Sequence, residues 1–287
     1  ERIQTPLITT LHTVLPSPSK VQEDIIEALW LKSAYTVVPT HAARDLLSSR
    51  YSLDPRSIVV IPHGTDPSLQ WVARLRGFMT GPRGAPNLLT WGLIGPGKGL
   101  EWTVQAVARL KSRYPDIVYT IAGKTHPKVA LRDGESYRKA LEKTVSELGL
   151  QENVRFIDDY ISPDMLREVL LETSVVVVPY DSTEQIVSGV LVEAVAANVP
   201  VVATAFPHAV ELAEQRAVVT VSHRDPDAIA EAIARILGST AAWEQMMGAQ
   251  RAIAPELEWG SVAMGYERLV DNLVIGSAQM SHVSPAS

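Results

Sequence analysis

A glycine-rich segment over residues 91–99 carries a lysine in a setting suited to phosphate binding. It reads WGLIGPGKG and lies between an apolar strand pattern and a helix pattern. Glycines let backbone N–H groups approach an anion, the start of the next helix adds partial positive charge, and Lys98 adds a full charge beside Gly97. Lys98 is followed by glycine, which departs from the Walker pattern. The alternative is a tight turn with a solvated lysine, and this segment alone does not decide between the two.

A second polar segment, YDSTEQIVSG over residues 180–189, also follows an apolar run and precedes a helix pattern. Ser188 and Gly189 would begin that helix, so that free N–H groups there and at Val190 face a diphosphate. Glu193 lies a turn and a half further on and would accept hydrogen bonds from ribose hydroxyls. The alternative is a capping or surface carboxylate, which the apolar neighbours of Glu193 disfavour because a buried charge needs a partner.

Other polar residues have simpler interpretations. Asp225 and Asp227 have the D-x-D spacing that holds a metal and a diphosphate in some transferases, but they precede a helix pattern. We therefore expect them to cap that helix. His41 follows Thr40, which looks like an N-cap, so His41 is expected on the surface. No His and Glu cluster suggests a metal site.

The elements that must position these segments alternate between strand and helix patterns. Short apolar, β-branched runs predict strands at 8–14, 35–38, 57–61, 87–94, 117–122, 154–157, 174–179, 200–204 and 217–221. Amphipathic stretches predict helices at 21–31, 101–113, 135–148, 163–171 and 228–237. Continuous apolar strands are typical of parallel sheets covered on both faces. The order predicts a doubly wound α/β fold.

The domain division follows from a turn-rich segment with several prolines and glycines before residue 87. Three strand patterns precede it and six follow, so the first domain is expected to be incomplete in this chain. We predict the carboxyl-terminal part of a first Rossmann-like domain at 1–68, a linker at 69–86, a second domain at 87–240, helices at 241–275 and a flexible tail at 276–287.

Composition narrows the classes of partner and compartment. The 287 residues are 46% hydrophobic and carry a formal charge of −6, without a basic block that would attract nucleic acid. The absence of cysteine excludes disulfides and thiolate sites and suits the cytoplasm. The longest apolar runs are far shorter than the roughly 20 residues that span a bilayer. We expect no transmembrane segment and leave peripheral membrane association open.

Residues 98–237 resemble the donor domain of family 4 glycosyltransferases, which have the GT-B fold. The resemblance rests on the order of Lys98 and its glycine, IAG at 121–123, NVRF at 153–156, the helix with Glu193, and VVAT at 201–204 followed by Glu211. Upstream, TTLHT at 9–13 and IPHGTD at 61–66 resemble segments at the end of the acceptor domain and at the hinge.

This resemblance implies transfer of a sugar from a nucleotide-diphosphate donor to an unknown acceptor, with retention, without metal or cofactor, in a cleft between two Rossmann-like domains. Lys98 and the helix start at Ser188 would stabilise charge on the departing diphosphate. Gln185 would contact the sugar and Glu193 the ribose. His12 would act from the acceptor side, although such a histidine also fits an ordinary core or loop position. His208 and Glu211 are further candidates near the donor.

Two positions depart from the family pattern. Gln185 stands where the first of two glutamates is expected, and glutamine cannot carry negative charge. Leu93 stands where an arginine often precedes the lysine, so one cation near the diphosphate is missing unless Lys124 or Arg138 replaces it. These departures keep open an alternative: a non-catalytic nucleotide-sugar-binding or scaffold module that retains the fold.

Overall fold

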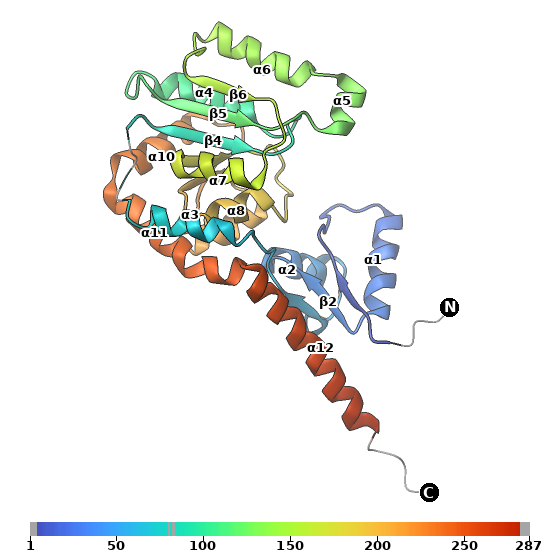
Figure 1. Ribbon diagram of the computed structural model, residues 1–287. Coiled ribbons are helices and arrows are strands. Elements are labelled where there is room, and N and C mark those ends of the chain that lie inside the picture. The colour runs from blue at the N-terminus through green and yellow to red at the C-terminus, as the bar shows by residue number, and fades with distance from the viewer. Residues whose placement is uncertain (1–4, 80, 82–83, 282–287) are drawn as a thin grey trace, which may run out of the picture. The chain divides into compact units, whose positions relative to one another are not determined.

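The computed structural model describes residues 5–79, 81 and 84–281 of the chain. The chain divides into two compact units (Figure 1). The first comprises Glu1–Gly64 together with Glu256–Ser287, and the second comprises Thr65–Pro255. The second unit contains both polar segments, 91–99 and 180–189, that are predicted to bind phosphate.

The described residues of the second unit form a parallel six-stranded sheet in the order β6-β5-β4-β7-β8-β9. Its strands are β4 (Asn87–Trp91), β5 (Val118–Ala122), β6 (Val154–Ile157), β7 (Val175–Val178), β8 (Val201–Thr204) and β9 (Val219–Val221). The chain runs outward from β4 to β6, crosses back to β7 and continues outward to β9. This is the doubly wound arrangement that the alternating pattern predicts.

Helices cover both faces of this sheet. One group contains α4 (Leu100–Leu110), α6 (Ser136–Glu147) and α10 (Pro226–Gly238). The other contains α3 (Ser68–Arg76), α7 (Pro163–Glu172) and α8 (Gly189–Ala196). The remaining helices are α5 (Pro127–Asp133), α9 (Pro207–Glu214) and α11 (Thr240–Ile253). Because both faces are covered, every residue of β7 and β8 is buried, which explains their continuous apolar sequences.

The first unit has a parallel three-stranded sheet in its described part, formed by β1 (Ile8–Thr10), β2 (Tyr35–Val38) and β3 (Ile58–Val60). Its helices are α1 (Lys20–Lys32), α2 (His41–Arg50) and α12 (Trp259–Ser281), with a short 3-10 turn at Pro55–Ser57. Val262 and Leu269 of α12 pack against Val37 and Ile61. The last helix of the chain is therefore part of the first unit's core.

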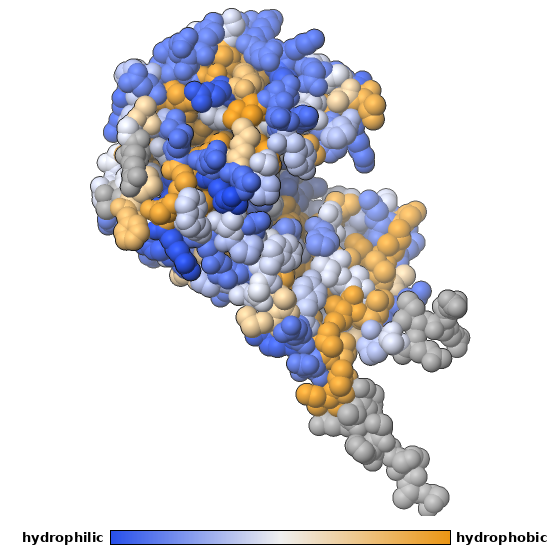
Figure 2. Space-filling view, in the orientation of Figure 1, coloured by the Kyte–Doolittle hydropathy of each residue, from blue (hydrophilic) through white to orange (hydrophobic). Residues whose placement is uncertain are grey.

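Exposed apolar side chains gather on two helices of the first unit (Figure 2). They include Val21, Ile25 and Leu31 of α1, and Val270 and Val274 of α12. None of the α1 residues is fully buried. Within the part of the chain that the structure describes, no helix is long and apolar enough to cross a membrane.

All nine predicted strands are present, although several are shorter than expected. The predicted linker at 69–86 is wrong over its first half, because α3 occupies it. Leu69, Val72 and Arg76 of α3 are buried, and α3 packs against α7 and α8. Arg76 is fully buried and donates to the carbonyl of Leu170 near the end of α7 at 2.9 Å and to that of Asn198 after α8 at 3.0 Å.

The carboxyl-terminal helices also divide differently from the prediction. The helices expected at 241–275 are present, but α11 belongs to the second unit and α12 to the first. Of the expected flexible tail at 276–287, residues 276–281 continue α12 and residues 282–287 lie outside the described residues. The division between units falls after Gly64, slightly before the predicted boundary at residue 68.

Candidate functional site

The two polar segments meet at one place on the sheet. Strands β4 and β7 are hydrogen-bonded neighbours, although β5 and β6 lie between them in sequence. After β4 the chain continues to β5 on one side of the sheet, and after β7 it continues to β8 on the other side. Such a switch point, at the carboxyl edge of a parallel sheet, is where doubly wound proteins bind ligands.

The glycines of the loop after β4 adopt conformations that other residues avoid. Gly92, Gly97 and Gly99 have φ angles of 112°, 86° and 63°. A Cβ atom on Gly99 would lie 1.9 Å from the carbonyl oxygen of Pro179, and the backbone N–H of Asp181 donates to the carbonyl of Gly97 at 3.0 Å. The loops after β4 and β7 are therefore joined backbone to backbone.

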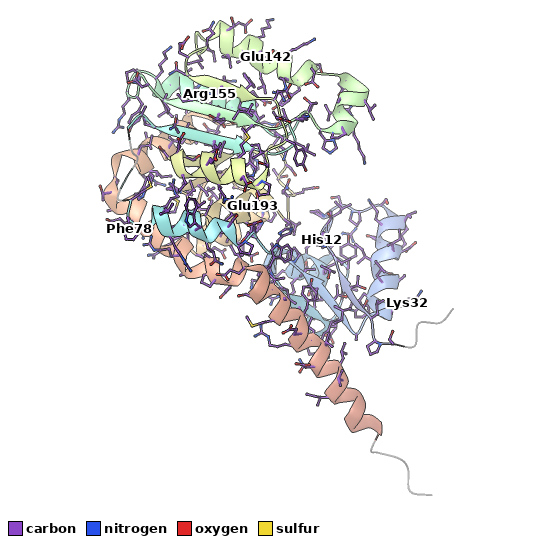
Figure 3. The ribbon with its side chains drawn as sticks, viewed as in Figure 1. His12, Lys32, Phe78, Glu142, Arg155 and Glu193 are labelled. Atoms are coloured by element: carbon purple, nitrogen blue, oxygen red, sulfur yellow. The ribbon has the colours of Figure 1, made fainter. Side chains whose placement is uncertain are left out.

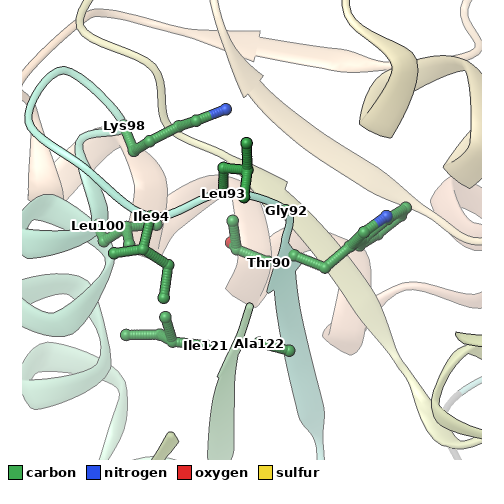
Figure 4. Close-up of a pocket in the computed structure, with 9 residues that line it drawn as sticks. Thr90, Gly92, Leu93, Ile94, Lys98, Leu100, Ile121 and Ala122 are labelled. Atoms are coloured by element: carbon green, nitrogen blue, oxygen red, sulfur yellow. The ribbon is translucent and has the colours of Figure 1, made fainter. Parts of the chain in front are cut away.

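Lys98 extends from this loop above the strand ends (Figure 4). It is half-buried, and its Nζ lies 4.3 Å from the centroid of the Tyr180 ring. Lys98 forms no ion pair with a carboxylate of the described residues. Below it lies a small recess, lined by Thr90, Trp91, Gly92, Leu93, Ile94, Lys98, Leu100, Ile121 and Ala122. The charge of Lys98 therefore remains available to an anion.

The start of α4 contributes less than the sequence suggested. Its first amide, that of Leu100, donates to the hydroxyl of Tyr137 at 3.3 Å, and this hydroxyl donates to Glu101 at 2.5 Å. Burial, followed by the neighbouring Glu101, raises the pKa of Tyr137, so its phenol stays protonated and keeps donating. A helix start with an acidic first turn and a bonded first amide is a poor anion site, so what the glycine loop offers an anion is Lys98 rather than the start of α4.

The start of α8 has the opposite character. Ser188 is its N-cap: its Oγ accepts from the N–H of Leu191 at 3.3 Å, and its own N–H donates to Nδ1 of His208 at 3.1 Å. Within the described residues, the N–H groups of Gly189 and Val190 have no protein acceptor. Two amides at the positive end of α8 are thus open to an anion.

His208, a sequence candidate, is buried and serves the helix start. Because an amide N–H can only donate, Nδ1 of His208 must accept, so a neutral imidazole carries its proton on Nε2. His208 lies near the beginning of α9 and reaches across to the loop after β7. His208 therefore holds the N-cap residue of α8, Ser188, in place.

Glu193 has the partner that its apolar setting requires. The indole Nε1 of Trp91, at the end of β4, donates to Oε2 of Glu193 at 3.1 Å. Trp91 is 7% exposed and Glu193 is half-buried on α8, where Figure 3 labels it. The carboxylate is therefore held at the switch point. Trp91 is not among the predicted site residues, although its place as the last strand residue before Gly92 is a usable signal.

The side chain of Gln185 forms a hydrogen bond within its own loop. Its side-chain Nε2 donates to the carbonyl of Val187 at 2.8 Å. Its amide oxygen accepts no hydrogen bond from the described residues, and the role of Gln185 toward a sugar stays a prediction.

The two cations considered as replacements for the missing arginine behave differently. Arg138 is 5% exposed, donates to the carbonyl of Gly123 at 2.7 Å and pairs with Asp158 at 3.0 Å. It braces the loop after β5, so it is not a replacement. Lys124 is exposed and pairs with Asp159 at 3.3 Å. A backbone hydrogen bond from Tyr160, followed by Lys124, lowers the pKa of Asp159.

The remaining candidates lie elsewhere. His12 is exposed in the bend after β1 of the first unit (Figure 3), and its action on a donor stays a prediction. Glu211 is half-buried on α9.

The capping expectation for Asp225 is confirmed, because its side chain accepts from the N–H of Ala228 at 2.9 Å, while Asp227 pairs with Arg109. No group of three metal-binding side chains occurs among the described residues.

A doubly wound sheet with a lysine and two open helix amides at its switch point defines an α/β protein whose switch point offers positive groups to an anion. Residues 85–239 match the family model of glycosyl transferases group 1, and residues 2–69 match that of glycosyltransferase family 4. The first match covers more than half of the chain, so the protein belongs to the group 1 glycosyltransferase family and is a glycosyltransferase. No curated protein matches the sequence.

Solved structures show the same fold. A glycosyltransferase from Rickettsia africae superposes with a TM-score of 0.74 at 17% identity, covering 93% of this chain and 70% of the other. The Anabaena protein HepE, in complex with UDP, gives 0.77 at 18% identity, with 93% and 72% covered. Sucrose-phosphate synthase from Thermosynechococcus elongatus gives 0.72 at 22% identity, with 94% and 68% covered. The chain has a GT-B-like fold.

Proposed function

We propose that the second unit binds the diphosphate of a nucleotide-sugar donor between Lys98 and the start of α8. One observation carries this proposal: an unneutralised ammonium and the open amides of Gly189 and Val190 belong to the two loops at the sheet's switch point. All three groups attract anions. A fold neighbour binds a ligand of the proposed kind, since HepE was solved with UDP and with UDP-glucose.

The proposed reaction is transfer of the sugar to an acceptor with retention of configuration and without metal. Negative charge grows on the diphosphate as the glycosidic bond breaks, and fixed positive groups aimed at that charge lower the barrier. Lys98 and the α8 amides are held by their loops before any ligand binds, so little reorganisation is needed. In this proposal they supply the stabilisation that a metal supplies in other transferases.

The other residues have subsidiary roles in the proposal. Glu193, held by Trp91, accepts hydrogen bonds from the ribose. The free amide oxygen of Gln185 accepts from a sugar hydroxyl, and Lys124 lies at the rim of the donor site. His12 contributes from the acceptor-binding unit. We also propose a cytoplasmic location, which a cysteine-free composition suits.

Replacement of Lys98 tests the diphosphate site. A charge-assisted contact is worth about 1.5 to 3 kcal/mol, so Lys98→Ala should weaken binding of UDP about 10- to 150-fold and leave binding of uridine nearly unchanged. Calorimetric titrations with UDP and uridine, and with the GDP and ADP pairs, measure this. Lys111→Ala is the matched control, because Lys111 lies just after the far end of α4 and donates to the carbonyl of Gly149. If Lys98→Ala lost the same factor of affinity for UDP and for uridine, the assignment of Lys98 to the diphosphate site would be wrong.

A further inference from the structure

Tyr180 contacts the proposed phosphate site without having a role in it so far. It is the second residue after β7 and only 3% exposed. Its ring lies under the ammonium of Lys98, with Nζ 4.3 Å from the centroid. The face of an aromatic ring carries negative potential and attracts a cation at this distance.

Tyr180 is held both through its backbone and through its ring. The carbonyl of Tyr180 accepts from Oγ1 of Thr204 at 2.6 Å and from Nδ1 of His223 at 2.9 Å. The ring stacks on Phe206, with centroids 5.5 Å apart and planes inclined by 22°. Phe206 is itself fully buried. Tyr180 is thus a rigid surface for Lys98 to rest on.

The next residue holds the backbone of the same loop. The N–H of Asp181 donates to the carbonyl of Gly97 at 3.0 Å. Its carboxylate accepts from the indole of Trp102 at 2.9 Å and pairs with Arg224 at 3.4 Å. Two consecutive residues after β7 therefore contact the backbone of Gly97 and the side chain of Lys98.

We propose that Tyr180 is a positioning residue that keeps the ammonium of Lys98 directed at the diphosphate; this inference rests on the proposed function. A carboxylate partner would also fix a lysine, but it would neutralise the charge that the ligand needs. An aromatic face restrains the same side chain and leaves its full charge in place. Without the ring, Lys98 gains rotamers that point into solvent, and binding of a diphosphate must then restrict them.

Two substitutions separate the ring from the rest of the tyrosine. Tyr180→Phe keeps the aromatic face, and UDP affinity should stay within about twofold of the unaltered chain. Tyr180→Leu removes the face, and UDP affinity should fall about 3- to 10-fold, in line with the strength of an exposed to partly buried cation–π contact. Uridine affinity should not change in either variant. A purely structural role would lower both affinities in Tyr180→Leu.

A second measurement keeps Tyr180 in place, because Tyr180→Leu could unfold the loop. It observes the Lys98 side chain directly by NMR. Lysines labelled by reductive methylation with ¹³C give one NMR signal each, and the Lys98 signal is identified by its loss in Lys98→Arg. Ring-current shielding should displace that signal upfield, and Tyr180→Phe should keep the displacement. A Lys98 signal at an ordinary position, or unchanged UDP affinity in a folded Tyr180→Leu, would overturn the inference while the proposed function stands. If the unaltered chain bound neither UDP, GDP nor ADP, the proposed function itself would fail.

Discussion

Two glycines with nearly the same backbone conformation allow the contact between the site's two loops to be tested. Gly99 has a φ of 63° and Gly149 a φ of 65°. A Cβ on Gly99 would lie 1.9 Å from the carbonyl oxygen of Pro179, whereas a Cβ on Gly149 would meet nothing within 4 Å. Alanine at either position therefore carries the same left-handed strain, and only Gly99→Ala also forces the two loops apart.

The magnitudes follow from these two terms. An alanine in the left-handed region costs about 1–2 kcal/mol. Overpacking against a rigid backbone adds about 1–3 kcal/mol, and here the obstacle is backbone rather than a flexible side chain. A domain of this size loses roughly 2–4 °C of Tm per kcal/mol. We therefore expect Gly149→Ala to lower Tm by about 2–8 °C and Gly99→Ala by about twice as much.

Thermal unfolding and UDP titration of the same samples give the two readouts. Gly99→Ala should also weaken UDP binding, since it displaces the loop that carries Lys98 from the loop that leads to α8. Gly149→Ala, in the turn between α6 and β6, should leave UDP binding unchanged. Equal Tm values and equal UDP affinities for the two variants would refute the reasoning, because the loops would then separate at negligible cost.

Three further outcomes are expected. Trp91→Phe keeps an aromatic ring but removes the N–H that orients Glu193, so it should weaken uridine and UDP binding by a similar factor in titrations; a loss confined to UDP would contradict the ribose assignment. Arg76→Met leaves carbonyls at the ends of α7 and α8 without their donor and should lower the free energy of unfolding by about 1–3 kcal/mol in urea, with Arg74→Met, an exposed neighbour on α3, as the control. Chelation with EDTA should leave donor turnover unchanged; loss of activity that manganese restores would overturn the metal-free mechanism.

The strands could be predicted because their sequences allow few alternatives. Runs such as VVVV at 175–178 and VVAT at 201–204 are apolar at every position, which suits only a strand buried on both faces. Helix α3 was missed because turn-forming residues surround it, and the short run from Leu69 to Arg76 was counted with them. Its spacing of Leu69, Val72 and Arg76 was a usable signal, and it is these three residues that α3 buries.

The site was predictable in its segments but not in its pairings. Ser188 as a helix cap and the need of Glu193 for a partner follow from local chemistry, and both are observed. That the partner is Trp91 depends on β4 lying beside β7, which strand patterns alone do not specify. The same adjacency brings Lys98 to the ring of Tyr180.

The substitution of leucine at position 93 changes how the proposed diphosphate site must work. Leu93 lines the recess beside Lys98, where the resemblance to family 4 enzymes implies an arginine. Arg138 is a poor replacement for that arginine, because its guanidinium is buried and its Nη2 bonds Gly123 and Asp158. Within the described residues, Lys98 is then the one full positive charge that the loops after β4 and β7 place at the switch point. The partial positive charge of the α8 amides supports it. A site with a single unneutralised cation depends strongly on that cation's position, which gives a physical reason for a lysine held by an aromatic ring rather than by a carboxylate.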